Sequence, residues 1–208
     1  MKIGVIGTGN MGDGLGRLWA SRGHKVMFGS RNPESVRTMA GITPNISSAS
    51  VEAAARHGDV VLLAVPWNGV ESSIRSAGSL SGKILIDCTN PLTENFMDLV
   101  IGFSTSGAEE IAKMASGARV VKAFNTVSSV TLSKPAFNSI ASTVFYCGDD
   151  AEAKKTVAKL IGDLAFEPID AGPLKNARYL EPMAELFIQL AYSQGMNAEM
   201  AFKLLRKQ

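Results

Sequence analysis

A glycine-rich turn near the amino terminus is the first stretch of this sequence whose residue types and spacing could support chemistry. Gly7, Gly9 and Gly12 match the pattern G-x-G-x-x-G, directly after an apolar run and at the start of a segment with helical spacing. In that context Gly7 permits a tight turn, Gly9 lets the backbone approach a pyrophosphate, and Gly12 lets helix and strand pack closely. The unpaired amides at the helix start would hold the anion, so we expect a dinucleotide site rather than a turn without function.

A serine and an arginine stand about 20 residues further on, where a site selective for NAD usually has an acidic residue. A carboxylate there would repel the 2′-phosphate of NADP. Ser30 can donate a hydrogen bond to that phosphate, and Arg31 can bind it through its planar guanidinium group or lie over the adenine ring. Thr8 is near enough in such turns to assist. The pair therefore predicts NADP, the alternative being an arginine exposed in a loop.

Three segments that follow expected strands are further candidates, because ligands of open α/β sheets lie beyond the carboxyl ends of the strands. They are residues 65–67, 89–91 and 125–128. Their prolines stiffen the chain, and Asn or Thr can bind a carboxamide through side chain or backbone. Each segment could instead be an ordinary turn, and Trp67 could be a core or interface aromatic. The binding residues expected here are Val65, Pro66, Trp67, Asn90, Asn125, Thr126 and Val127.

No residue can be assigned from the sequence as a general acid or base. His24 and His57 lie away from the expected site, and Asp149 with Asp150 is typical of a helix cap. No cysteine and histidine cluster has the spacing of a metal site, and no nucleophile-elbow sequence occurs. Carbonyl reduction usually needs a proton donor, whereas hydride transfer between a nicotinamide and a flavin-like ring mainly needs face-to-face placement. The pattern favours a reductase that passes hydride from one cofactor to another.

Alternating elements must position these residues. Short apolar runs, rich in β-branched residues, predict strands that are buried on both faces, and helical spacing lies between several of them. The pattern predicts an α/β fold of Rossmann type, doubly wound around a mostly parallel sheet. The predicted strands are residues 2–7, 24–30, 59–66, 83–91 and 118–125, with weaker candidates at 142–148 and 167–172.

The character of the chain changes after residue 172. Apolar residues at helical spacing predict a helix around residues 183–191, with Pro182 marking a kink or an early turn. The last residues are good helix formers, but their alternating apolar residues favour an edge strand. We predict an NADP-binding Rossmann domain over residues 1–172 and a small C-terminal helical or strand segment over residues 173–208. That segment is too short to fold alone and should pack on the domain or on a second subunit.

Composition limits the function classes. Of the 208 residues, 46% are hydrophobic and 19% charged, and the formal net charge is +2, so neither a nucleic-acid nor a membrane partner is expected. No apolar run approaches the length of a membrane span, and the amino terminus has the pattern of a strand rather than a signal peptide. Cys88 and Cys147 lie in apolar runs and are expected to be reduced core thiols rather than a disulfide, which suits a cytoplasmic protein.

Six segments together resemble a known family. The letters GTGNMG, FGSRNPES, AVPW, VVKAFNTVS, YCGDDAEAK and DAGPLKNARYLEPMAEL are similar, in order and at matching spacing, to the NADPH-dependent coenzyme F420 reductases and their bacterial relatives. They also resemble the cytosolic oxidoreductase domain of the STEAP metalloreductases, whose membrane and haem portion has no counterpart in these 208 residues. The resemblance implies a cytoplasmic, often dimeric NADP-dependent oxidoreductase. Its partners would be small-molecule redox cofactors: NADP(H) and a deazaflavin (coenzyme F420) or a flavin (FMN or FAD) as hydride partner.

Matched residue by residue, the resemblance implies where each part of the ligands lies. Thr8, Ser30 and Arg31 fall at the 2′-phosphate. The other matches fall at the pyrophosphate (Asn10, Met11), beside the nicotinamide (Pro66, Trp67) and on the deazaflavin side of the cleft (Asn125, Thr126, Val127).

The chain departs from the archaeal members of the family at two positions. They carry a basic residue near Ser35, for which Arg37 is the candidate substitute, and a histidine where this chain has Asn125. NADP remains the expected coenzyme, and the identity of the acceptor stays open.

Other functions also remain open. Hydroxyacid and imine reductases have similar amino-terminal halves but usually attach a much larger helical domain, for which 208 residues leave little room. A non-enzymatic redox sensor would bind NADPH through the same turn and would need no acceptor pocket. A reductase of another small acceptor would share the coenzyme site alone.

Overall fold

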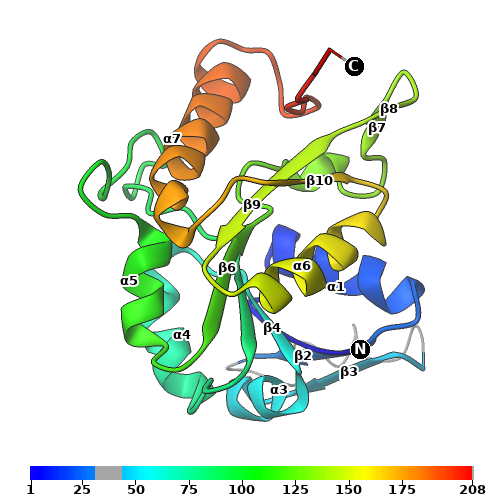
Figure 1. Cartoon of the computed structure of the whole chain (residues 1–208), viewed down its shortest axis with the longest axis vertical. Helices are drawn as coiled ribbons and strands as arrows, with labels where there is room; N and C mark the ends of the chain where they lie inside the picture. Colours follow the sequence, from blue (N-terminus) through cyan, green and yellow to red (C-terminus); the bar gives the residue numbers. More distant parts are fainter. Residues whose placement is uncertain (31–43, 208) are drawn as a thin grey trace.

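The computed structural model describes residues 1–30 and 44–207 of the chain. An eight-stranded sheet runs through its centre in the order β10-β9-β6-β5-β4-β1-β2-β3 (Figure 1). Among these strands, β9 runs antiparallel to β6, and the other neighbouring pairs are parallel. The strands are β1 (Lys2–Ile6), β2 (Lys25–Gly29), β3 (Ile46–Ala49), β4 (Val60–Leu63), β5 (Ile84–Asp87), β6 (Arg119–Ala123), β9 (Thr143–Gly148) and β10 (Glu167–Asp170).

Helices cover both faces of the sheet, which is why its central strands are apolar throughout. Buried side chains of α1 (Asn10–Ser21) and α6 (Ala151–Gly162) form the core on one face. Those of α3 (Val51–His57), α4 (Val70–Ala77) and α5 (Gly107–Met114) form it on the other face. Figure 1 shows the two groups of helices on opposite sides of the sheet. Each of the seven predicted strands is present within its predicted range, and the doubly wound, mostly parallel Rossmann-type prediction is confirmed.

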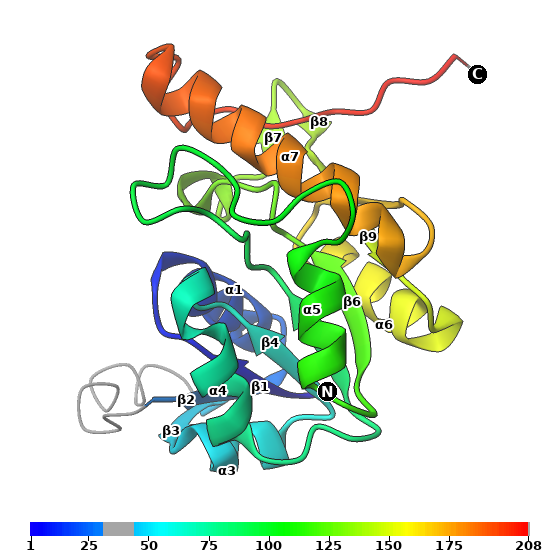
Figure 2. The same ribbon diagram turned by 90° about the vertical axis from the view of Figure 1, so that its left-hand side faces the viewer.

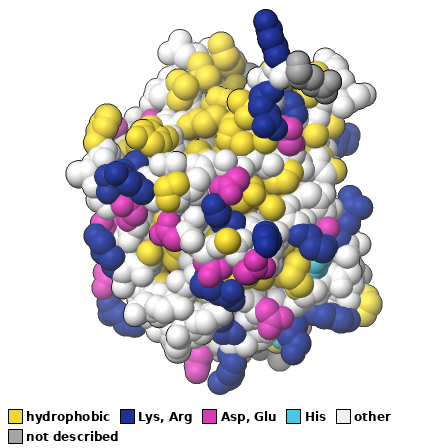
Figure 3. All heavy atoms as spheres, viewed as in Figure 1, with side chains coloured by type: hydrophobic (Ala, Val, Ile, Leu, Met, Phe, Trp, Pro, Cys, Tyr) yellow, Lys and Arg dark blue, Asp and Glu magenta, His cyan; other side chains and the backbone are white. Residues whose placement is uncertain are grey.

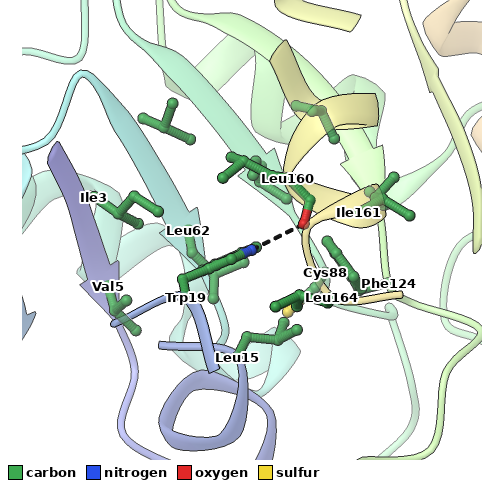
Figure 4. Close-up of a cluster of buried hydrophobic side chains, with 14 of the residues drawn as sticks. Ile3, Val5, Leu15, Trp19, Leu62, Cys88, Phe124, Leu160, Ile161 and Leu164 are labelled. Atoms are coloured by element: carbon green, nitrogen blue, oxygen red, sulfur yellow. Dashed lines mark hydrogen bonds between the residues drawn. The ribbon is translucent and has the colours of Figure 1, made fainter. Parts of the chain in front are cut away.

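Trp19 anchors α1 on the first of these cores. Its side chain is fully buried, and its indole Nε1–H donates a hydrogen bond to the Leu160 carbonyl of α6 at 3.0 Å (Figure 4). The ring also meets Phe124 edge to face, with centroids 5.8 Å apart. Because α1 begins at the glycine turn, these contacts fix the position of that turn relative to the sheet.

Two strand pairings were not predicted. β3 extends the sheet beyond β2, but its residues ISSA carry one buried apolar side chain, Ile46, and so give no apolar run. A separate hairpin joins β7 (Ala136–Phe137) to β8 (Ile140–Ala141). Its strands are two residues long, too short for any periodic pattern to reveal them.

The end of the chain differs from the predicted edge strand. Residues 198–207 form neither helix nor strand, although the Thr143 amide donates a hydrogen bond to the Phe202 carbonyl at 3.0 Å. Thr143 is the first residue of β9, and β6 pairs only with the last part of that strand. The free edge is therefore too short to support a further strand.

The predicted C-terminal helix is present as α7 (Ala177–Ile188), with Pro182 inside it and a π-helical turn, Gln189–Ser193, after it. It lies across the loop between β5 and α5 (Figure 2). Arg178 holds it to α5 through a two-pronged contact with Glu109, at 2.8 and 2.7 Å. This packing brings α7 above the carboxyl ends of the central strands.

The cysteine prediction is confirmed, because Cys88 and Cys147 are both buried and free. None of the helices in the described part of the chain has the length and apolar character to cross a membrane.

Candidate functional site

The glycine turn joins β1 to α1, and its geometry explains why each of three positions carries glycine. Gly7 has φ 106°, and a Cβ there would lie 2.1 Å from the Ala64 carbonyl oxygen. A Cβ on Gly12 would lie 1.9 Å from the Gly7 carbonyl oxygen, so the helix packs directly on the turn. A Cβ on Gly9, in contrast, would meet no described atom within 4 Å. Space therefore remains beside the first amides of α1, as an anion site requires.

A cleft with two lobes lies at this end of the sheet. The smaller lobe, about 630 Å³, is bordered by the glycine turn, the end of β2 and the start of α4. The larger lobe, about 810 Å³, is bordered by the start of α1, the exits of β4 and β5, and the loop between β5 and α5. Both have the size of ligand pockets. Gly9, Ala64, Val65, Pro66 and Asn68 border both lobes, so the two form one elongated cleft with the turn at its middle.

Most of the predicted binding residues meet at this cleft. Thr8 and Ser30 border the smaller lobe, whereas Trp67 and Asn90 border the larger one. Trp67 also packs against the core on the α4 and α5 face, so its two predicted roles coexist. The other predicted residues that border one lobe or both are Gly7, Gly9, Asn10, Met11, Val65 and Pro66.

The remaining predicted residues that the structure describes do not border the cleft. Gly12 is buried behind the turn. Asn125 and Thr126 are buried after the end of β6, and Val127 packs against the core. The exit of β6 therefore supports the cleft from behind.

Of the two residues predicted to select the 2′-phosphate, Ser30 and Arg31, the structure describes Ser30. Ser30 directly follows β2, and its amide donates a hydrogen bond to the Ala49 carbonyl at 3.1 Å, which fixes the backbone at the smaller lobe. Arg31 and Arg37 lie outside the described residues, so their contacts with a 2′-phosphate stay predictions.

Sequence reasoning missed two groups of residues that border the cleft. Asn68, Ser72 and Ser73 extend the polar wall of the smaller lobe from the start of α4. Small polar residues just after the Pro66 exit were the available signal. The loop after β5 borders the larger lobe and follows no periodic pattern, so nothing in the sequence marked it; its bordering residues are Leu92, Thr93, Glu94, Phe96 and Val100.

A buried ion network lies beneath the β5 exit. The Lys122 ammonium of β6 lies 2.9 Å from Asp87 Oδ2 and 2.8 Å from Glu181 Oε1, and all three side chains are essentially inaccessible. Asp87 and Lys122 are direct neighbours on adjacent strands. Glu181 also accepts hydrogen bonds from the amides of Gly107 and Ala108, at 2.8 and 3.1 Å. The network thereby joins β5, β6, α5 and α7.

The same network holds Thr89, which precedes Asn90. Asp87 Oδ1 accepts hydrogen bonds from the Thr89 amide and hydroxyl, both at 2.8 Å. Lys122 Nζ donates to the Thr89 carbonyl at 2.6 Å. Because every polar group of Thr89 is engaged, the backbone that carries Asn90 into the larger lobe is fixed.

Electrostatics keep this region in one charge state. Burial alone would lower the pKa of Lys122, but Asp87 and Glu181 more than reverse that effect, so the pKa is raised and the lysine stays charged. Burial raises the pKa of Cys88, which borders the larger lobe, to about 12, so its thiol stays protonated and is a poor nucleophile. Sequence reasoning found no role for Lys122, although a lysine inside an apolar strand was the available signal.

The other titratable groups considered from the sequence lie elsewhere. His24 Nε2 is 3.0 Å from Asp163, His57 Nε2 is 3.3 Å from a backbone carbonyl, and neither histidine borders the cleft. Asp150 accepts a hydrogen bond from the Ala153 amide at 2.7 Å, which confirms the predicted helix cap. Within the described ranges, no group of three or more His, Cys, Asp or Glu side chains could hold a metal ion.

The cleft can bind and orient flat rings, and it offers little for proton transfer. Among the described residues that border the larger lobe, Cys88 and the exposed Glu94 are the ionisable ones, and the rest are apolar, amide or hydroxyl side chains. Such a lobe suits two rings placed against each other.

A family model, a relative and a solved structure agree on one family. The family model described as NADP oxidoreductase coenzyme F420-dependent matches residues 2–91. The F420-dependent NADP reductase of Methanocaldococcus jannaschii is 31% identical over 207 residues, which cover 91% of this chain and 92% of that protein. A crystal structure from Arthrobacter sp. FB24, described as a candidate F420-dependent NADP-reductase, has a TM-score of 0.91 and 30% identity, and the match covers 99% of this chain and 100% of the other.

A longer relative matches with part of its length. Metalloreductase STEAP3 of Rattus norvegicus is 34% identical over 181 residues, which cover 86% of this chain. This chain spans 36% of the length of that relative.

Proposed function

This chain belongs to the F420-dependent NADP reductase family and is an NADP-dependent oxidoreductase, and from this premise we propose that it transfers hydride between NADP(H) and a deazaflavin (coenzyme F420) or flavin-type acceptor. The family membership confirms the resemblance carried by the six sequence segments. The observation that carries the proposal is the two-lobed cleft, which has a glycine turn between a polar lobe and a mostly apolar one.

The donor set of the cleft fits a dinucleotide. Thr8 and Ser30 would hold the adenosine end in the smaller lobe, and the first amides of α1 would hold the pyrophosphate beside Gly9. Pro66 and Trp67 would lie beside the nicotinamide in the larger lobe. When bound, NADPH supplies the hydride and the acceptor ring takes it up.

The residues of the larger lobe would bind, orient and exclude water. Trp67 and Phe96 offer apolar surface to a flat ring, and Asn90 offers hydrogen bonds to its polar edge. A ring-to-ring transfer asks no side chain to donate a proton, which agrees with a lobe whose thiol stays protonated and whose carboxylate, Glu94, lies at the exposed rim.

An anaerobic mixing experiment tests the proposal. Purified protein and NADPH are mixed in separate reactions with oxidised coenzyme F420, FMN and riboflavin, and the absorbances of NADPH and of the acceptor are followed together. We expect equimolar loss of NADPH and of at least one oxidised ring, and a much slower reaction when NADH replaces NADPH. Reduced coenzyme F420 with NADP⁺ tests the reverse direction.

The outcomes separate the remaining alternatives. Tight NADPH binding without oxidation by any ring would contradict hydride transfer to a deazaflavin or flavin. Oxidation of NADPH by a small non-ring acceptor alone would assign a different substrate to the larger lobe.

A homodimer is part of the same proposal. Hydrophobic side chains gather over the end of the molecule that carries α7 and the C-terminal residues (Figure 3). Along α7 and just beyond it, Tyr179, Leu186, Tyr192 and Met196 are exposed, and a second copy of the chain would cover them. Sedimentation equilibrium at several concentrations tests this, and a monomer at all of them would contradict it.

A further inference from the structure

Asn90 presents a side-chain amide to the larger lobe, and both of its polar atoms are engaged from behind. Asn125 Nδ2 donates to Asn90 Oδ1 at 3.0 Å, and Asn90 Nδ2 donates to the Asn125 backbone carbonyl at 3.0 Å. Asn125 Nδ2 also donates to the Leu180 carbonyl of α7 at 2.9 Å. Asn125 itself is buried and does not border the cleft, so its link to a ligand runs through Asn90.

These contacts allow one orientation of the Asn90 amide. The Asn125 backbone carbonyl can only accept a hydrogen bond, so the Asn90 atom that faces it must be the nitrogen. The Asn125 atom that faces the Leu180 carbonyl must be a nitrogen for the same reason. Turning the Asn90 amide over would set oxygen against oxygen and nitrogen against nitrogen. The hydrogen-bond chemistry therefore fixes which edge of Asn90 faces the cleft.

The Asn90 amide keeps half of its hydrogen-bonding capacity. Asn90 Nδ2 has a second N–H, and Asn90 Oδ1 has a second lone pair. These two groups point to opposite sides of the amide, because the edge on which its N–H and carbonyl lie side by side is the one that Asn125 occupies. Each can therefore bind one polar group of a ligand. Both candidate ligands of the lobe carry such groups, on the carboxamide of nicotinamide and on the pyrimidine ring of a flavin or deazaflavin.

Asn125 is poorly explained by stability alone. In the described part of the chain its Oδ1 is buried without a hydrogen-bond partner, which costs stability. The residue before it, Phe124, has φ 64°, a left-handed conformation that bulky residues rarely adopt. The Phe124 ring is fully buried against Trp19 and Phe166, and this packing holds the bent backbone. The exit of β6 is thus constrained at the point where Asn125 meets Asn90.

We propose that Asn125 is a positioning residue, which holds the Asn90 amide in the orientation that offers its remaining N–H or lone pair to a polar group of a ligand in the larger lobe. The inference rests on the proposed function, because it assigns that lobe to the nicotinamide and the acceptor ring. Asn125 touches neither ligand and acts through Asn90.

A double-mutant cycle tests the proposal, with Asn90→Ala, Asn125→Ala and the double variant. The measurements are the dissociation constant of NADPH, by fluorescence titration, and the KM of the acceptor. We expect each single change to weaken the same ligand by about tenfold, the effect of one hydrogen bond. The double variant should be no weaker than Asn90→Ala, because Asn125 has no separate contact to lose. Effects that multiply, to about hundredfold, would overturn the proposal.

A second substitution at the same position tests the proposal if Asn125→Ala fails to fold. Asn125→Asp keeps the shape but sets a carboxylate oxygen against Asn90 Oδ1, while the backbone carbonyl of residue 125 still requires the Asn90 nitrogen. Neither orientation of the Asn90 amide then satisfies both contacts, so the amide should lose its fixed position and its match to the ligand. We expect the same loss as for Asn125→Ala, and no loss when Asn90 is already alanine. An unchanged affinity in a folded Asn125→Asp protein would contradict the proposed role.

A coenzyme analogue identifies which ligand group Asn90 binds. The 3-acetylpyridine analogue of NADP keeps the carbonyl of the carboxamide but lacks its N–H. If Asn90 Oδ1 accepts from the carboxamide N–H, the preference for NADP⁺ over this analogue should disappear in both Asn90→Ala and Asn125→Ala. If it binds the acceptor, that preference persists and the acceptor KM rises in both. Because the NADP⁺ titrations need no turnover, a failure of hydride transfer would be seen separately from a failure of this inference.

Discussion

The three glycines of the turn show how single residues divide between fold and ligand. Gly7 and Gly12 leave no room for a Cβ, so the fold requires them. Gly9 has open space around it and an ordinary extended backbone, with φ −74° and ψ −177°. The fold would therefore accept a larger residue at Gly9, whereas a ligand bound beside the turn would be obstructed by it.

We therefore predict opposite effects for two substitutions in this turn. Gly9→Val should raise the dissociation constant of NADPH by about tenfold or more, because its side chain would enter the space beside the α1 amides. Its melting temperature should stay that of the wild type. Gly12→Ala should lose about 1–3 kcal/mol of unfolding free energy through overpacking. NADPH titration and thermal unfolding of the two proteins check this. A Gly9→Val protein that binds NADPH with normal affinity would show that the pyrophosphate does not lie beside the turn.

Coenzyme selection is also predicted at the residue scale. Arg31→Ala should weaken NADPH by about tenfold to a hundredfold, the loss of a charge-assisted contact, and should leave NADH nearly unchanged. Arg22→Ala, which removes an exposed arginine at the far end of α1, is the matched control. Binding titrations with both coenzymes measure the effect. An equal fall for the two coenzymes would show that Arg31 does not read the 2′-phosphate.

At the scale of elements, the Lys122 network decides how the strand exits and α7 are held together. It joins two strands to the start of α5 and to α7, and it engages all the polar groups of Thr89. A buried ion pair adds little net stability compared with apolar packing, but removing one member leaves an uncompensated charge. The network therefore holds the geometry of the β5 exit more than it stabilises the fold.

Lys122→Met should lower the unfolding free energy by about 3–5 kcal/mol, because two buried carboxylates would lose their counter-charge. Urea unfolding measures the change. The control is Lys155→Met, which breaks an exposed pair with Glu152 and should have little effect. A Lys122→Met protein as stable as Lys155→Met would mean that water or protonation relieves the carboxylates.

At the scale of the whole molecule, His24 ties the amino terminus to the opposite part of the chain. Its Nδ1 faces the terminal ammonium of Met1 at 3.3 Å, and its Nε2 faces Asp163 at 3.0 Å. Burial lowers the pKa of His24 below its usual 6.5, against the opposing hydrogen bond with Asp163. The folded protein therefore holds this ring neutral.

The stability of the whole protein should accordingly fall in mild acid. Below pH about 6.5 the unfolded chain takes up a proton on His24 that the folded chain resists, so unfolding becomes easier until the lower folded pKa is passed. Urea unfolding at pH about 7 and about 5.5 should show a larger loss for the wild type than for His24→Gln. A wild type that gains stability over this range would mean that the ion pair with Asp163 outweighs burial.

The local sequence predicts the fold and those residues of the cleft that directly follow strands. Apolar runs, the glycine pattern and the turn residues after the strands predicted the sheet, the turn and the cleft-bordering positions from Gly7 to Asn90, because strand burial and turn sterics depend on neighbouring residues. The pairing of Ser30 with Arg31 likewise predicts the coenzyme from two adjacent side chains, although Arg31 lies outside the described residues.

Only the tertiary structure decided which side chains contact these positions from behind the cleft. Lys122 meets Asp87 across 35 residues of sequence, and Asn125 meets Asn90 across the same separation. Whether such side chains touch depends on strand order and register, which no local periodicity encodes. For the same reason Asn125, predicted to face a ligand, proved to lie behind Asn90, and the loop after β5 proved to border the larger lobe.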